Sequence, residues 1–347
     1  MNDHIPSRQH RATVLSTPAA IDQALRDEAL RVAGRGVWHD DPRVHDLIDR
    51  MPSMHDDESL RASLVSVRAL LSPDAARAAA THMRQELKTL AFATSTIGPE
   101  VDLVDSYTSL VAPNFLRSHL GLETALTAHD LRAFSLSLTA ELVRQDTPDK
   151  EHVGVILDVN DRLQTFVSSL RQAHRDDHPL NPLIAAVPDD RDVAAVVCLL
   201  ASGGQETVSS LTCSVLQAIT QEAGFADDWR SDPVAVVDEI AGAFPPIMML
   251  ARVAERDTQV DGIEIQAGRT VLLDLTSISS SAGLAFGMGL HRCLGRSVAR
   301  TVIPIAVDEL LEAMPHLRDG HFYLSGSPVP GIFRGPMNMS LLLPAGT

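Results

Sequence analysis

Residues 286–295 constrain the fold of this chain more than any other part of the sequence. They read Phe-Gly-Met-Gly-Leu-His-Arg-Cys-Leu-Gly and precede a long stretch with apolar residues at helical spacing. The glycines predict a tight loop that delivers Cys293 to the N-terminus of a helix. There the helix dipole and unpaired backbone N–H groups stabilise a thiolate, so we expect a lowered pKa for Cys293. Such a sulfur suits an iron, and the glycines would let the backbone pass close under a flat macrocycle.

Cys293 also admits other interpretations. Free cysteine is often buried simply as a small apolar residue, so an inert thiol is the simplest alternative. A zinc site fits less well, because Cys198, Cys213 and Cys293 are scattered and neither C-x-x-C nor H-E-x-x-H is present. The glycines do not make a dinucleotide-binding loop, because Arg292 takes the last glycine position of G-x-G-x-x-G.

Two adjacent glycines lie inside the longest expected helix, over residues 190–223. Gly203 and Gly204 each cost on the order of 1 kcal/mol there relative to alanine, so a reason for them is expected. A missing side chain lets a planar group or a dioxygen molecule lie against the backbone. Glu206 and Thr207 supply an acid and a hydroxyl beside that gap. The alternative is a kinked helix with a solvated carboxylate.

Both segments resemble motifs of the cytochromes P450. The cysteine segment matches the haem-binding signature F-G-x-G-x-H-x-C-x-G at each specified position, and the glycine pair matches the distal-helix motif A/G-G-x-E/D-T. The resemblance implies haem b (iron protoporphyrin IX) with Cys293 as the iron ligand. The residues that it implies for cofactor binding are Arg252, Phe286, Gly287, His291, Cys293 and Gly295. Those that it implies for catalysis are Gly203, Gly204, Glu206 and Thr207, with Thr207 bonded to iron-bound oxygen and Glu206 relaying protons.

Arg252 matches the arginine that binds a haem propionate in the family, and its alternative is a surface arginine in a strand. His291 can reach a carboxylate at the ring edge. A further propionate pair, His-x-x-x-Arg near the third helix, is not clear in this sequence. The possible substitutes are His55, Arg61 and Arg68.

The resemblance also has departures. Residues 237–246 resemble the family's helix K, whose E-x-x-R motif is incomplete here because Glu239 is followed by Gly242 in place of arginine. Only residues 277–283 separate the strand that ends near Thr276 from Leu284-Ala285-Phe286, so most of the family's meander is missing. The loss would alter the face at which an electron donor docks.

Arg292, Arg296 and Arg300 recur every four residues beside the cysteine. The functional interpretation is a positive patch for an acidic electron donor. The alternative is an ordinary solvated helix face, balanced by the acids further along the same helix. Those acids are Asp308, Glu309 and Glu312.

Charge and composition exclude several classes of function. The formal net charge of −16 argues against nucleic acid as a partner, because phosphate binding needs a basic face. No apolar stretch is long enough to span a membrane. The chain begins without the apolar core of a secretory signal, and its 3 cysteines offer no disulfide framework, so we expect a cytoplasmic protein.

Periodicity predicts a mainly α fold with small β-sheets, and the resemblance implies an abbreviated P450-like fold. Apolar residues at helical spacing predict helices over residues 20–33, 72–92, 122–144, 150–175, 190–223 and 294–314. Short strands are expected over 258–275, with a hairpin turn at Asp261-Gly262, and a last hairpin over 320–343. Without repeats or an obvious linker, residues 1–347 predict a single haem domain.

Three functions follow from the resemblance. The first is a haem-thiolate monooxygenase that tailors a small secondary metabolite with electrons from a ferredoxin-type partner. The second is a haem enzyme of the same fold that catalyses a non-oxygenating or peroxide-dependent reaction, such as a cyclase, isomerase or dehydratase. The third is a non-catalytic relative that activates another biosynthetic enzyme. The third ranks last because such relatives typically lose both motifs that this chain retains.

Overall fold

Helices make up most of the computed structural model, which describes residues 12–32, 39–54, 58–98, 100–144, 147–173, 177–278, 282–326 and 333–342. The α-helices are α1 (Pro18–Arg26), α2 (Pro42–Asp49), α3 (Glu58–Leu70), α4 (Pro73–Ser95), α5 (Ser109–His119), α6 (Ala128–Val143), α7 (Lys150–Ala173), α8 (Asn181–Ala186), α9 (Asp190–Gln221), α10 (Ala223–Ser231), α11 (Pro233–Ala243), α12 (Ala282–Ala285) and α13 (Arg296–Ala313). The mainly α fold with small β-sheets expected from the sequence is confirmed.

The strands form three small sheets. They are β1 (Thr13–Leu15), β2 (Leu30–Arg31), β3 (Glu100–Asp102), β4 (Met249–Ala254), β5 (Thr258–Val260), β6 (Ile263–Ile265), β7 (Thr270–Asp274), β8 (His321–Ser325) and β9 (Asn338–Leu342). The sheet orders are β1-β7-β4-β2, β3-β9-β8 and β5-β6. The hairpin turn expected at Asp261-Gly262 is confirmed, with both residues at positive φ, and the last hairpin is β8 and β9.

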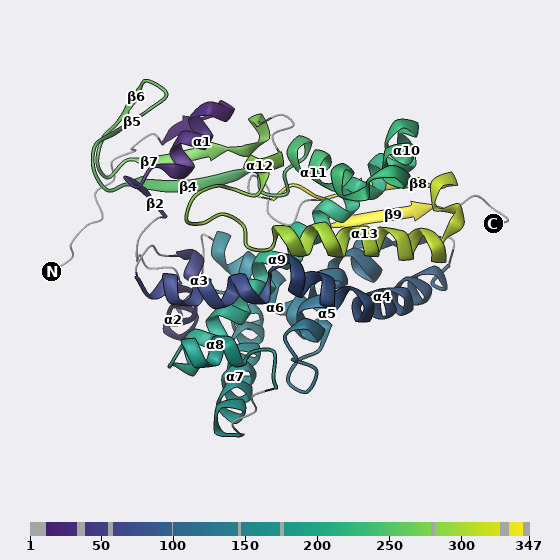
Figure 1. Ribbon diagram of the computed structural model, residues 1–347, viewed down its shortest axis with the longest axis horizontal. Helices are drawn as coiled ribbons and strands as arrows, with labels where there is room; N and C mark the ends of the chain where they lie inside the picture. Colours follow the sequence, from purple (N-terminus) through teal and green to yellow (C-terminus); the bar gives the residue numbers. More distant parts are fainter. Residues whose placement is uncertain are drawn as a thin grey trace.

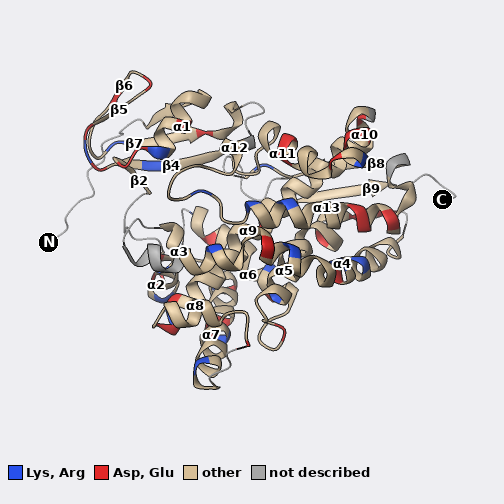
Figure 2. Cartoon of the chain, viewed as in Figure 1, with Lys and Arg blue, Asp and Glu red and all other residues tan. Residues whose placement is uncertain are grey.

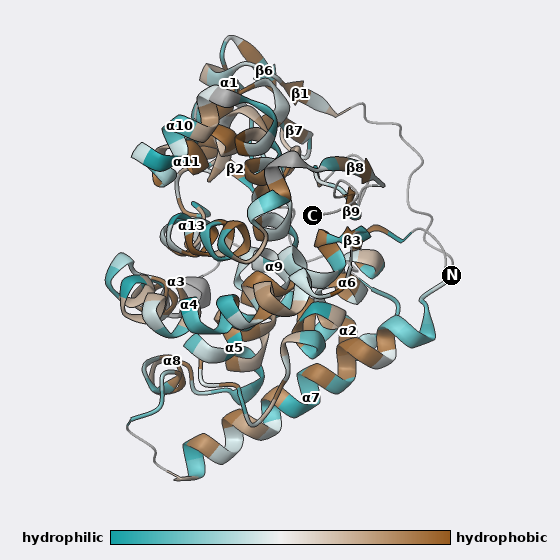
Figure 3. Cartoon of the chain, turned by 90° about the vertical axis from the view of Figure 1, so that its right-hand side faces the viewer, coloured by the Kyte–Doolittle hydropathy of each residue, from teal (hydrophilic) through white to brown (hydrophobic). Residues whose placement is uncertain are grey.

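Helix α9 runs through the middle of the helical part of the molecule (Figure 1). It packs against α5, α6, α7 and α13, and most of its residues are buried. Helix α7 lies at the outside, and in Figure 3 it carries alternating hydrophobic and hydrophilic bands, as a helix with one buried face should. Helix α13 also makes an extensive contact with α4, so α13 lies packed between α4 and α9.

Two hydrophobic cores result from this arrangement. The helical core is formed by the buried faces of helices such as α4, α5, α9 and α13, with Tyr107 and Phe134 among its largest side chains. The α/β core lies between α1, the four-stranded sheet and α12, and includes Ile21, Leu25 and Leu273. Partly buried Ala285 packs against both cores, so the two meet just before the cysteine segment.

Most helices expected from periodicity are confirmed, and two boundaries were wrong. The expected helix over 20–33 is α1, which ends at Arg26 because residues 30–31 pair with β4 as a strand. The expected helix over 122–144 is α6, which begins at Ala128. Thr127 caps it there, because its hydroxyl accepts the Asp130 N–H while the Asp130 carboxylate accepts the Thr127 N–H. Helix α5 was not predicted, since it is buried on nearly all sides and shows no amphipathic period.

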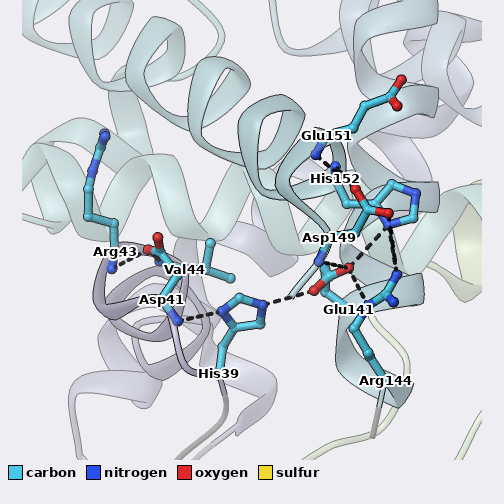
Figure 4. A network of polar contacts seen from close by, with 9 residues as sticks. All are labelled: His39, Asp41, Arg43, Val44, Glu141, Arg144, Asp149, Glu151 and His152. Atoms are coloured by element: carbon cyan, nitrogen blue, oxygen red, sulfur yellow. Dashed lines mark hydrogen bonds and ion pairs between the residues drawn. The ribbon is translucent and has the colours of Figure 1, made fainter. Parts of the chain in front are cut away.

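A buried carboxylate joins three of these helices (Figure 4). Glu141, near the end of α6, accepts hydrogen bonds from His39 Nε2 at 3.1 Å, Arg144 Nε at 2.8 Å and His152 Nδ1 at 3.1 Å. His39 Nδ1 accepts a hydrogen bond from the backbone N–H of Asp41, and Asp41 is the N-cap residue of α2. The network therefore fixes the start of α2 and the first turn of α7 to α6. Within the described ranges, no helix has both the length and the apolar composition to cross a membrane.

Candidate functional site

The cysteine loop, residues 286–295, connects α12 to α13 and rests on the end of α1. Gly287 and Gly289 have φ of +68° and +71°, the left-handed region that favours glycine. A Cβ on Gly289 would lie 2.5 Å from the carbonyl oxygen of Leu25, so the close approach to α1 requires glycine. The loop is closed by the Cys293 N–H, which donates to the carbonyl of Phe286 at 2.8 Å.

Cys293 is exposed, and its free surface lies on the wall of a cavity. Although this surface is accessible, the protein packed around the sulfur raises the pKa of the thiol by desolvation. This effect outweighs the backbone N–H groups of Gly295 and Arg296 and the charge of Arg296, which all favour the thiolate. The lowered pKa expected from the sequence was therefore wrong for this structure. The predicted N–H donors at the start of α13 are nevertheless present, because Gly295 is the N-cap residue.

The cavity has a volume of about 360 Å³ and a mostly apolar wall. One part of the wall is the cysteine loop with the start of α13, and another is the middle of α9. The predicted site residues on this wall are Gly203, Gly204, Thr207, Phe286, Gly287, His291, Cys293 and Gly295. Two segments far apart in the sequence thus share one cavity.

The glycine pair leaves α9 unbroken. The helix continues from Asp190 to Gln221, so the glycines do not mark a break in it. A Cβ on Gly203 would meet no atom within 4 Å, which means that the space beside it is open. Thr207 also lies on the cavity wall, and its hydroxyl donates to the carbonyl of Gly203 at 2.8 Å.

Glu206 lies away from the cavity wall, although Thr207 is its neighbour. It is 6% exposed, so the solvated carboxylate of the alternative interpretation is not what the structure contains. Burial raises the pKa of Glu206 to about 7, opposed by the charge of Arg132 on α6 and a hydrogen bond from Gln205. Its Oε1 has no hydrogen-bond partner among the described residues. The carboxyl group therefore keeps its proton to a higher pH than an exposed glutamate does.

Arg252 also lies apart from the residues that line the cavity. It is 8% exposed in β4, so it is not a surface arginine, and its Nη1 donates to the carbonyl of Ala251 at 2.8 Å. Its role at a haem propionate stays a prediction, as does that of His291 on the cavity wall. Of the substitutes, Arg68 is exposed on α3. His55 and the side chain of Arg61 lie outside the described residues.

The arginines of α13 are not balanced by the acids of the same helix. Figure 2 shows the basic residues at its N-terminal end and the acidic residues towards its C-terminal end. Arg296 and Arg300 instead contact Asp238 of α11 at 3.2 and 3.5 Å, and Arg292 is exposed. The acids bind elsewhere, with Asp308 accepting from Trp229, Glu309 from Arg84 and Glu312 from Lys88.

Asp238 and Arg132 were not singled out in the sequence. Asp238 stands directly before Glu239 in the incomplete E-x-x-R segment, and no pattern distinguishes the two acids. Only the packing of α11 against α13 shows which of them meets the arginines. Arg132 is likewise placed beside Glu206 by the packing of α6 on α9.

Comparison with solved structures identifies this arrangement. The chain superposes on P450BioI, solved in complex with a hexadec-9Z-enoic acid-ligated acyl carrier protein, with a TM-score of 0.80 over 95% of this chain and 91% of that one, at 18% identity. It superposes on epothilone D-bound cytochrome P450epoK with a TM-score of 0.81 over 96% and 91%, at 20% identity. The chain has the cytochrome P450 fold.

Curated proteins similar to this chain include a cytochrome P450 and an N-oxygenase. Cytochrome P450 105C1 of a Streptomyces species is 25% identical over 240 residues, which are 58% of this chain and 63% of that protein. Nocardicin C N-oxygenase of Nocardia uniformis is 27% identical over 257 residues, 64% of this chain and 61% of that protein. The chain thus spans less than two thirds of the length of these relatives, and no protein-family model matches it. The resemblance to the cytochromes P450 found in the sequence is confirmed.

Proposed function

We propose that this protein is a haem-thiolate monooxygenase that acts on a small, largely apolar metabolite. The observation that carries the proposal is that Cys293 and the glycine pair of α9 lie on the wall of one apolar cavity. The thiol of Cys293, on a glycine loop, is suited to bind one face of a flat iron macrocycle. The glycine pair of α9, which has no side chains, is suited to lie against the other face. Pockets of a few hundred Å³ with few polar groups are typical sites for cofactors and small ligands.

The residues present fit haem b. Cys293 would ligate the iron, because backbone N–H groups of Gly295 and Arg296 stabilise a thiolate at this position. Gly203, beside open space, leaves room for the opposite face. His291 and Arg252 are the proposed partners of the propionates. Thiolate-ligated haem supplies the activation of dioxygen when it is bound, since the sulfur pushes electron density towards the iron and favours O–O cleavage.

The chain's own residues supply proton handling and the exclusion of water. The Thr207 hydroxyl lies at the cavity and can exchange its bond to the Gly203 carbonyl for one to a ligand. Glu206, with a pKa of about 7, can hold or release a proton near neutral pH, which is the property of an effective general acid. The mostly apolar wall offers water few hydrogen-bond partners in the site, so an apolar ligand can displace it.

Electron supply and pathway complete the proposal. Electrons would come from a ferredoxin-type partner that docks near the exposed Arg292. Relatives include 20-oxo-5-O-mycaminosyltylactone 23-monooxygenase of Streptomyces fradiae and Nocardicin C N-oxygenase. These names favour tailoring of a secondary metabolite. The proposal places this activity in a single haem domain in the cytoplasm.

The test is the absorbance of the reduced carbon monoxide complex of the purified, haem-supplemented protein. We expect a thiolate-type Soret band that is lost in Cys293→Ala, while Cys213→Ala, which changes a buried thiol of α9, keeps it. A wild-type protein that stays colourless, or a Cys293→Ala variant with unchanged absorbance, contradicts the proposal.

A haem enzyme without the usual electron supply is the second candidate. It is favoured by the pairing of Arg296 and Arg300 with Asp238, which neutralises part of the basic patch expected to receive an electron donor. The two candidates differ in their co-substrate. Turnover with a surrogate ferredoxin and its reductase supports the monooxygenase, and turnover only with peroxide, or without reductant, supports the second candidate.

A further inference from the structure

Helix α11 meets the start of α13, directly after the cysteine loop, through one carboxylate. Asp238 has 20% of its side chain exposed, and its Oδ2 accepts a hydrogen bond from Arg296 Nη2 at 3.2 Å. Its Oδ1 lies 3.5 Å from Arg300 Nε, one turn further along α13. Glu239 has no ion-pair partner among the described residues, and Gly242 offers no side chain. Asp238 is therefore the charged group through which α11 acts on the start of α13.

Arg296 in turn contacts both ends of the cysteine loop. Its guanidinium lies over the ring of Phe286, 5.4 Å from the ring centroid, and its backbone N–H faces the sulfur of Cys293. Phe286 and Cys293 are themselves joined by the hydrogen bond from the Cys293 N–H to the Phe286 carbonyl. The side chain of Arg296 thus covers the first residue of the loop while its backbone begins the helix that follows.

Arg296 depends on Asp238 for its position. Its Nε is buried and makes no hydrogen bond among the described residues, so the Asp238 carboxylate and the Phe286 ring are what hold the guanidinium. A planar guanidinium can bind a carboxylate with one edge and stack on an aromatic ring with its face, and an ammonium cannot do both. Loss of the carboxylate would free the side chain to leave the ring.

We propose that Asp238, acting through Arg296, is the positioning residue that holds the cysteine loop in the geometry needed for sulfur ligation. Asp238 does not touch the sulfur or the cavity. It fixes Arg296, Arg296 covers Phe286, and Phe286 holds the backbone of Cys293. The part of the proposal that concerns ligation rests on the proposed haem-thiolate function, and the part that concerns the loop does not.

The effect should be local. An ion pair between partly exposed side chains contributes little to global stability, about 0.2 to 1 kcal/mol, so the unfolding midpoint is a poor probe. The upper part of that range, about 0.4 to 1 kcal/mol, changes the opening equilibrium of one loop by about 2- to 5-fold. Amide hydrogen exchange of residues 286–295 measures that opening, and it needs no bound haem.

The experiment compares Asp238→Asn with Glu312→Gln in the full-length protein without haem. Both variants remove one negative charge, and Glu312 forms an exposed pair with Lys88 on the distant part of α13. We expect residues 286–295 to exchange about 2- to 5-fold faster in D238N, to stay unchanged in E312Q, and to recover in the conservative D238E. Equal exchange of the loop in D238N and E312Q overturns the proposal.

Spectroscopy of the haem-supplemented variants gives the second readout. D238N should raise the thiol-type fraction of the reduced carbon monoxide complex about 2- to 5-fold, and D238E should reverse this. If D238N does not fold, Arg296→Lys tests the proposal instead, because it keeps the positive charge but loses the planar guanidinium that stacks on Phe286. Unchanged amide exchange of residues 286–295 in this variant then overturns the proposal. Faster loop exchange in D238N with no thiolate-type band in the wild type supports the positioning role and contradicts the proposed function.

Discussion

At the scale of single residues, Gly289 is where the cysteine loop tolerates no side chain. Gly289→Ala places a Cβ against the Leu25 carbonyl in addition to the strain of a left-handed backbone. We expect a loss of more than about 2 kcal/mol in the free energy of unfolding, of which the backbone accounts for about 1 kcal/mol. Urea unfolding measures the loss, and haem uptake should fall with it.

The matched control is Gly262→Ala in the β5–β6 turn. Its φ of +79° carries the same backbone strain, but a Cβ there would meet nothing within 4 Å. The loss should stay near 1 kcal/mol. Equal losses for the two variants would show that the contact with Leu25 is unimportant.

Glu206 gives a prediction about pH. Its carboxyl group has a pKa of about 7 in the folded chain, because of burial, against 4.5 in the unfolded chain. Between these values the native state binds more protons, so its stability falls as the pH rises and levels off above about 7. The penalty from Glu206 at high pH is on the order of 3 kcal/mol. Glu206→Gln should remove this dependence and be more stable than the wild type at pH 8.

Unfolding in urea between pH 5 and pH 8 tests this. Glu222→Gln, which changes an exposed carboxylate just after the same helix, should follow the wild-type profile. A wild-type stability that does not fall across the interval, or an E206Q variant that falls equally, contradicts a raised pKa in Glu206.

At the scale of helices, the Glu141 network fixes α2 and α7 to α6 (Figure 4). Burial opposes ionisation of Glu141, but hydrogen bonds from His39, Arg144 and His152 outweigh it and hold its pKa below the ordinary value. Glu141→Gln removes the charge that these donors share and should cost about 2 to 3 kcal/mol at neutral pH. The loss should appear first as faster amide exchange at the start of α2.

The pH dependence of this contribution has the opposite sign to that of Glu206. A carboxylate with a lowered pKa stabilises the fold above pH 4.5 and loses that effect as the pH falls through its folded value. Wild type and E141Q should therefore converge in stability below pH 4.5. Glu151→Gln, an exposed neighbour in the first turn of α7, serves as the control. A constant difference between wild type and E141Q at all pH values is the contrary result.

These helices show what the sequence could predict. Helices α4, α7, α9 and α13 have a regular apolar period, and Ser72 and Asp189 cap α4 and α9, so the extents of these helices were predicted within a few residues. Helix α5, with Pro113 inside and apolar residues on most sides, has no such period. The loop motif placed Cys293, but its raised pKa depends on what the fold packs around it. Packing also decides which side of α9 Glu206 faces, and which acid of α11 contacts Arg296.

At the scale of the whole molecule, the cavity lies where the two hydrophobic cores meet. Its wall includes Leu250 and Leu275, which pack in the α/β core, and Val196 of the helical core. The cysteine loop joins the same two parts, since Gly289 rests on α1 and the loop continues into α13. A ligand that fills the cavity therefore contacts both cores, and its binding energy resists their separation.

Haem binding should thus couple the two cores. Without haem, we expect the amides of β4 and β7 in the smaller α/β core to exchange through a local opening that leaves α9 protected. Haem at 100 times its dissociation constant stabilises the closed state by about 2.7 kcal/mol if it does not bind the opened state, so exchange in β4 and β7 should slow by up to about 100-fold. Cys293→Ala, which removes the proposed iron ligand, should lose most of this protection. If haem slows exchange in α9 alone, the ligand does not bridge the cores, because only a group that contacts both can oppose their opening.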